Sequence, residues 1–136
     1  MAVDTSMPAL YAGFGCRRGC PADTLETLLR QALDHHGLAL PALRGIASIV
    51  LKADEPGLQL LATRLGVPLL LYDDRQLAPY EPLLSHRSVI AHAHSGCWGV
   101  AESAALAMAS QHLGAARLLV TRQVYGPATL ALACGR

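Results

Sequence analysis

The chain has 136 residues, of which 52% are hydrophobic and 15% are charged, and its formal net charge is +1. This length suits one domain over residues 1–136 with a proper core, and so small a net charge gives no reason to expect nucleic acid as a partner. The chain has no uninterrupted run of about eighteen apolar residues and no basic segment leading into an apolar one, so we expect no membrane span and a cytoplasmic location.

The first predicted strand covers residues 8–14 and leads into a glycine-flanked turn that holds two arginines. A helix with Pro21 in its first turn follows. Glycine lets the backbone bend tightly, and a helix start offers free N–H groups and a partial positive charge. This loop is therefore predicted to bind an anion at the carboxyl end of a strand, the alternative being a plain turn with solvated arginines. The candidate binding residues here are Gly15, Cys16, Arg17, Arg18 and Gly19.

Five further elements follow before residue 79. Leucines and alanines recur at helical spacing over 22–36, which predicts a helix with one apolar stripe laid on a sheet. A buried strand is predicted over 46–51, and a polar turn then opens a second helix that ends at Gly66. The third strand is predicted over 67–72, and a short helix begins at Asp73.

The second half is harder to interpret at its start. Residues 79–95 are predicted to be a long loop, with a short strand over 89–94 as the alternative. An alanine-rich helix is predicted over 98–112. The last two strands, 117–122 and 128–133, are separated by so few residues that they form an antiparallel hairpin. The pattern predicts a three-layer α/β/α fold: a mostly parallel five-stranded sheet with a C-terminal antiparallel hairpin strand.

The turn that follows the second strand is the next candidate site. Right-handed crossovers place the turns after parallel strands along one edge of the sheet, so this turn is expected beside the arginine loop. Lys52 is the only lysine in the chain and follows a buried strand directly. Lys52, Asp54 and Glu55 are therefore candidate binding residues. The alternative is that Asp54 caps the next helix while Lys52 is solvated.

Glu102 lies in the early turns of the helix predicted over 98–112. We expect it to share one cleft with Lys52, opposite the arginine loop, and name the two as candidate catalytic residues. Lys52 would pair with a substrate carboxylate, and Glu102 would orient a cation or transfer a proton. The alternative is that Glu102 only interacts favourably with its own helix dipole.

Two spacings suggest metal or thiol chemistry, and both are incomplete. Cys16 and Cys20 have no matching second pair, and His92 and His94 would share a face only in an extended segment, so no metal site and no cofactor are predicted. Cys16 as a nucleophile is the alternative to a buried thiol. Without an export signal, all four cysteines are expected to be free thiols.

Three motifs, in this order along the chain, resemble the CobE / CbiG C-terminal domain family of cobalamin (vitamin B12) biosynthesis. They are GFGCRRG over 13–19, KADEPGL over 52–58 and GVAESAA over 99–105, and Gly126 with residues 129–133 is similar to that family's terminal strand. The similarity spans essentially the whole chain, which is most similar to the stand-alone members of the family. It implies that the chain binds a precorrin or corrinoid intermediate, as a carrier or accessory protein at the precorrin-5A ring-contraction and lactone-opening stage.

The resemblance leaves the question of enzymatic activity open. The longer CbiG proteins open the ring lactone of cobalt-precorrin-5A and release acetaldehyde, and they carry additional N-terminal regions. Without those regions, this chain is expected to bind or carry, or to act as an accessory hydrolase. The implied partners are a tetrapyrrole intermediate, whose acetate and propionate arms suit arginine forks, and other enzymes of the pathway. The high hydrophobic content also leaves room for a homodimer interface.

Two functions of other classes remain as alternatives. One is a small enzyme that uses the arginine loop on a phosphorylated or nucleotide substrate, although the chain lacks both G-x-x-x-x-G-K-[ST] and a first-turn G-x-G-x-x-G. The other is a non-catalytic interaction module, which the high hydrophobic content favours.

Overall fold

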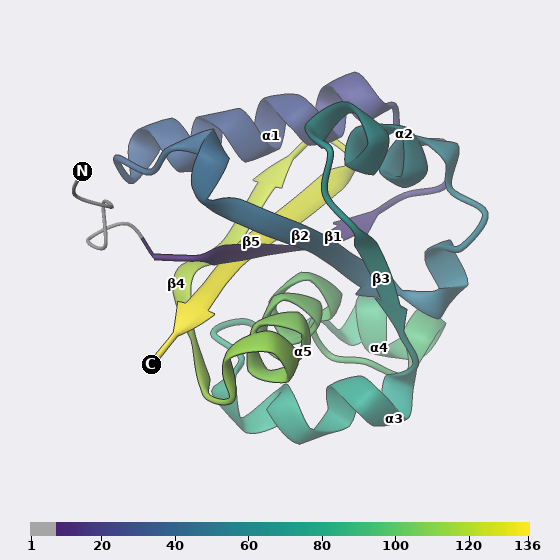
Figure 1. The fold of residues 1–136 in the computed structure, drawn as a ribbon. Coiled ribbons are helices and arrows are strands. Elements are labelled where there is room, and N and C mark those ends of the chain that lie inside the picture. The colour runs from purple at the N-terminus through teal and green to yellow at the C-terminus, as the bar shows by residue number, and fades with distance from the viewer. Residues whose placement is uncertain (1–7) are drawn as a thin grey trace.

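A five-stranded sheet between two layers of helices organises the protein (Figure 1). The structure is a computed structural model and describes residues 8–136. The strand order is β3-β2-β1-β5-β4, and only β5 runs against the other four. The predicted fold class is therefore confirmed, including the final antiparallel hairpin. The strands are β1 (Leu10–Cys16), β2 (Leu43–Ile49), β3 (Leu69–Tyr72), β4 (Ala116–Tyr125) and β5 (Ala128–Gly135).

The helices cover both faces of the sheet. Figure 1 shows α1 and α2 on one face, and α5 with the shorter α3 and α4 on the other. The α-helices are α1 (Ala22–His35), α2 (Pro56–Leu65), α3 (Asp74–Leu77), α4 (Val89–Ser95) and α5 (Val100–Leu113). Three 3₁₀ turns complete the connections: η1 (Leu40–Ala42), η2 (Val50–Lys52) and η3 (Ala78–Leu83). No helix within residues 8–136 is long and apolar enough to cross a membrane.

Strand β1 separates two hydrophobic cores because successive side chains of a strand point to opposite faces. Leu10, Ala12 and Phe14 pack with the leucines of α1 and α2. Tyr11 belongs to the other core, which is built mainly from the alanines of α5. Both sides of the central strand are therefore buried, as expected for a strand between two helix layers.

Gly13 lets α5 approach β1 closely. A Cβ atom at this position would lie 1.9 Å from the carbonyl oxygen of Ala101, in the first turn of α5. The backbone of the helix thus takes the space that a side chain would fill. This contact packs the first turn of α5 against the middle of β1.

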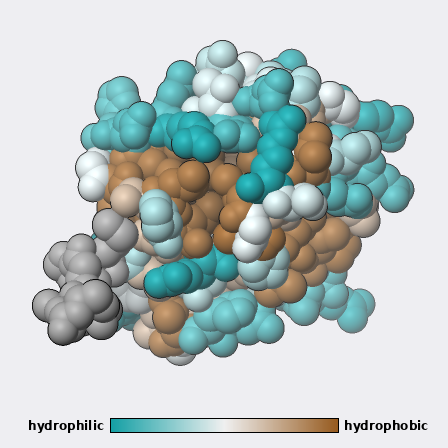
Figure 2. Space-filling view, turned by 45° about the horizontal axis from the view of Figure 1, so that its top comes forward, coloured by the Kyte–Doolittle hydropathy of each residue, from teal (hydrophilic) through white to brown (hydrophobic). Residues whose placement is uncertain are grey.

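Hydrophobic side chains also reach the surface. Figure 2 shows a broad hydrophobic area at the centre of one face, bordered by hydrophilic side chains. The partly buried residues that flank the first core are Cys16, Leu38, Leu40, Leu65, Val67, Leu69 and Leu119. A sequence that is 52% hydrophobic cannot bury all of its apolar groups in so small a molecule.

The structure corrects two predicted elements. The second strand ends at Ile49, so that Val50 and Leu51 leave the sheet in η2 and are 44% and 63% exposed. The predicted loop over 79–95 contains α4, and the alternative strand over 89–94 is also wrong. This helix begins at the Ser88 cap, whose hydroxyl accepts the N–H of Ala91 at 3.1 Å. It ends at Gly96, where φ is +75°.

Candidate functional site

The candidate site lies along the edge of the sheet where the parallel strands end. Strand β1 is followed there by the arginine loop, residues 17–21, and strand β2 by η2 and the polar turn, residues 52–55. The two segments touch: the N–H of Gly19 donates to Oε2 of Glu55 at 2.9 Å. The start of α5 reaches the same edge, since Val100 lies 3.9 Å from where a Cβ of Gly15 would stand. We call this edge the rim.

The arginine loop is held by its backbone. The N–H of Arg17 donates to the carbonyl of Pro127 in the β4–β5 turn at 3.0 Å, and the N–H of Cys20 donates back to the carbonyl of Arg17 at 3.1 Å. Gly19 has φ of +78°, a value that favours glycine. The side chains of Arg17 and Arg18 are exposed and form no ion pair with any of residues 8–136. The loop therefore presents two free cations on a fixed backbone.

Glu55 holds this loop from the adjoining polar turn. The residue is only 7% exposed, and its carboxylate accepts the N–H of Gly19. The next helix packs just as closely, because a Cβ at Gly57 would lie 2.2 Å from the carbonyl of Cys20. The structure thus brings Glu55 to the backbone of the arginine loop rather than to the open rim.

Lys52 and Asp54 lie on the outer part of the same turn. Lys52 is half-buried at the end of η2, and its ammonium group is near enough to Cys16 to lower the pKa of that thiol. Asp54 is exposed and does not cap α2, because the cap position is occupied by Glu55. Lys52 forms no ion pair within the described part of the chain.

The two cysteines of the loop are weak acids. Burial raises the pKa of Cys16 from 9.0 to about 11, against the opposing effect of Lys52. Burial also raises the pKa of Cys20, with Glu55 acting in the same direction. A thiol must lose its proton to act as a nucleophile, so this environment disfavours Cys16 in that role. Residues 8–136 contain no group of three or more His, Cys, Asp or Glu side chains arranged to hold a metal ion.

Glu102 is in the first turn of α5 and is almost fully buried, at 1% exposed. One oxygen accepts the N–H groups of Ser85 and His86 at 2.8 and 3.4 Å. The other accepts the hydroxyl of Ser85 and, at 2.9 Å, the N–H of Arg122 in β4. A carboxylate has about four acceptor sites, and all four are used. Glu102 therefore joins three segments, and in this conformation it does not share an open cleft with Lys52.

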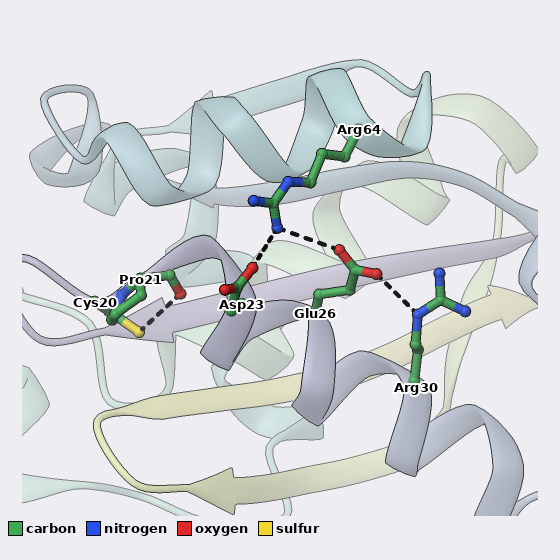
Figure 3. Close-up of polar contacts among 6 residues, drawn as sticks. All are labelled: Cys20, Pro21, Asp23, Glu26, Arg30 and Arg64. Atoms are coloured by element: carbon green, nitrogen blue, oxygen red, sulfur yellow. Dashed lines mark hydrogen bonds and ion pairs between the residues drawn. The ribbon is translucent and has the colours of Figure 1, made fainter.

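A hollow of about 420 Å³ lies beside the rim, between the first turns of α1 and α2. Arg64 of α2 lines it and reaches across to α1, where it contacts Asp23 at 2.6 Å and Glu26 at 3.5 Å (Figure 3). Glu26 also pairs with Arg30, and the Cys20 thiol donates to the carbonyl of Pro21. Because Arg64 is already paired, the hollow offers no free cation, whereas Arg17, Arg18 and Lys52 at the rim form no ion pair within residues 8–136.

Sequence interpretation missed Ser85 and His86. Both lie in the segment with the least regular pattern, and Ser85 meets Glu102 only through the fold. Its hydroxyl also lies 2.6 Å from Nδ1 of His86. Nothing in the spacing of these residues indicates a contact between positions 85 and 102.

Comparisons with known proteins agree on one family. The family model described as cobalamin synthesis G C-terminus matches residues 10–133. The protein CobE from Sinorhizobium sp is 39% identical over 124 residues, which are 91% of this chain and 79% of that protein. The crystal structure of CobE, a protein from the cobalamin (vitamin B12) biosynthetic pathway, matches with a TM-score of 0.89 and 43% identity. It covers 96% of this chain and 95% of the other.

A longer relative matches in part. The cobalt-precorrin-5A hydrolase of Priestia megaterium is 27% identical over 124 residues, which are 91% of this chain and 32% of that enzyme. The present chain is thus similar to about one third of the hydrolase.

Proposed function

The chain belongs to the cobalamin synthesis G C-terminus family, and on that basis we propose that its rim binds the carboxylate arms of a tetrapyrrole intermediate of cobalamin biosynthesis. The observation that carries this proposal is the exposed pair of Arg17 and Arg18 on a loop whose backbone is hydrogen-bonded to Glu55. Lys52 lies on the adjoining turn. Guanidinium groups form strong charge-assisted hydrogen bonds with carboxylates, often through two parallel contacts.

We assign the rim residues different tasks in this binding. Arg17, Arg18 and Lys52 are the cations that meet carboxylates, while Gly15 and Gly19 let the ligand approach the backbone. Cys16 and Asp54 border the same site, and Glu55 keeps the arginine loop in place. Glu102 acts through the segment it holds, as a positioning residue for Ser85 and His86.

The proposed activity is that of a binding or carrier protein. This chain covers about a third of the hydrolase from Priestia megaterium, so the complete hydrolase reaction is not proposed for it. A carrier needs affinity and a defined orientation of the ligand, and cations carried on a fixed loop backbone support both.

Titration with cobyrinic acid, a corrin with free carboxylate arms, tests the proposal. We expect saturable binding that shifts the visible absorption of the corrin. Loss of a charge-assisted contact costs about 1.5–3 kcal/mol, so Arg17→Ala or Arg18→Ala should weaken binding by roughly ten- to a hundred-fold.

Arg44→Ala is the matched control, because Arg44 is an exposed arginine near the start of β2, at the opposite edge of the sheet. It should bind like the parent protein. If both loop variants also bind cobyrinic acid like the parent protein, the site lies elsewhere.

A further inference from the structure

We infer that Glu102, Ser85 and His86 form a hydrogen-bonded acid–base chain, which we call the relay, whose working end is Nε2 of the exposed His86. The inference rests on the proposed function, because it supplies the acid–base group of the same rim. Its ligand chemistry is an O–H group, on the bound tetrapyrrole or on a water beside it, that donates to Nε2.

The direction of the hydrogen bonds follows from counting protons. The three backbone N–H groups around Glu102 can only donate, and the hydroxyl of Ser85 donates its single proton to the same carboxylate. The Ser85 oxygen therefore has only lone pairs left for His86, 2.6 Å away. Nδ1 of His86 must carry the hydrogen in this contact. In the neutral imidazole, Nε2 then has a free lone pair.

The relay is fixed at its inner end and open at its outer end. Glu102 is 1% exposed and bonds to β4 through the Arg122 N–H, whereas His86 is exposed. The carbonyl of His86 lies 3.3 Å from where a Cβ of Gly99 would stand, at the residue that precedes α5. The start of α5 in turn reaches Gly15, which lies two positions before the arginine loop. His86 therefore adjoins the start of α5, and that helix start reaches the rim.

The chemistry of this arrangement is reversible proton transfer. Nε2 takes the proton of a bound O–H group, whose oxygen keeps the electron pair of the broken bond. The ring becomes an imidazolium, and Nδ1 keeps its hydrogen bond to Ser85. When Nε2 returns the proton, the imidazole and its tautomer are restored.

Nitrogen-15 NMR of the histidine side chains tests the tautomer directly. In the intact protein His86, assigned by its loss in His86→Gln, should show a protonated Nδ1 and an unprotonated Nε2. Ser85→Ala removes the acceptor of the Nδ1 hydrogen, so His86 should shift toward the Nε2–H tautomer. His94, exposed on α4, should keep its signals. A His86 with hydrogen on Nε2 in the intact protein, or one unaffected by Ser85→Ala, would overturn the inference.

Modification by diethyl pyrocarbonate, read by peptide mass spectrometry, separates this inference from the proposed function. The reagent attacks unprotonated imidazole nitrogen, so His86 should react, and cobyrinic acid should slow that reaction several-fold while His94 is unchanged. Full reactivity at His86 while cobyrinic acid binds through the arginine loop would refute the relay's place in the site and leave the proposed function standing. Absence of any binding would refute the proposed function. The NMR measurement of the His86 tautomer would still test whether the relay exists.

Discussion

At the scale of single residues, the buried acidic side chains organise the rim and the exposed basic ones face solvent. Glu55 holds the Gly19 N–H, and Glu102 holds Ser85, His86 and Arg122. A buried carboxylate needs donors, because burial without hydrogen bonds costs several kcal/mol. Each of these two residues therefore ties a loop to the sheet or to a neighbouring loop, and the cations beside them stay free for a ligand.

The acidity of the Cys16 thiol depends on the positive charge of Lys52. With its pKa raised to about 11 by burial, Cys16 should be alkylated slowly at neutral pH, and the rate should rise with a midpoint near pH 11. Lys52→Met removes the cation that lowers this pKa, so at neutral pH, where lysine is charged, alkylation of Cys16 should become slower still. Arg44→Met, at the opposite edge, is the control. A midpoint near 9 in the parent protein, or faster alkylation at neutral pH in Lys52→Met, contradicts the assignment.

The same raised pKa sets the sign of a pH effect on stability. Between about pH 9 and 11 the unfolded thiol loses its proton while the folded thiol keeps it. The unfolded state then binds fewer protons, so the contribution of Cys16 to the free energy of unfolding falls as the pH rises through this range.

At the scale of elements, the contact between β1 and α5 is so close that it leaves no room for a side chain at Gly13. Residues Ala101–Ala109 of α5 are all buried, and most are alanines, so the helix lies low on the sheet. Gly13 completes the fit from the side of the strand. The start of α5, and Glu102 with it, is positioned by this contact.

Gly13→Ala should destabilise the protein strongly. Its Cβ would lie 1.9 Å from the Ala101 carbonyl oxygen and 2.6 Å from the Ala105 nitrogen, so helix and strand must separate. We expect a loss of at least about 1–3 kcal/mol in the free energy of unfolding, measured by urea denaturation. Gly135→Ala is the matched control, since its nearest new contact is an ordinary 3.4 Å. Equal stability of the two variants would refute the close-approach argument.

At the scale of the whole molecule, the topology brings three basic side chains to one edge of the sheet even though the net charge is only +1. The parallel strands end on one edge, and the turns that follow β1 and β2 bring Arg17, Arg18 and Lys52 to it. A nearly neutral protein can thus bind a polyanionic ligand locally.

Binding of cobyrinic acid should therefore weaken as salt increases. The screening length falls from about 10 Å at 0.1 M salt to about 3 Å at 1 M, and the rim cations are exposed. Isothermal titration at several salt concentrations should give a falling affinity, with a shallower slope in Arg17→Ala. An affinity that does not depend on salt would show that apolar contacts dominate.

Much of the fold was determined by local patterns in the sequence. The stripe of Leu25, Leu28, Leu29 and Leu33 can be buried only on one face of a helix, and α1 forms there with those residues buried. The turn around Gly126 leaves too few residues for a crossover, so β4 and β5 pair antiparallel. The arginine loop and its position after the first strand also follow from sequence, because glycines, a proline and the end of an apolar run are local signals.

Tertiary structure alone decided what the acidic residues contact and how residues 79–99 fold. Short polar segments contain cap signals such as Ser88 and Gly96, but whether they become a helix depends on what they pack against. Glu55 lies 36 residues from Gly19, and Glu102 lies 17 from Ser85, so no local pattern links the members of either pair. A buried carboxylate accepts from whichever donors the packed backbone brings to it, and that choice is made only when sheet, helices and loops are assembled.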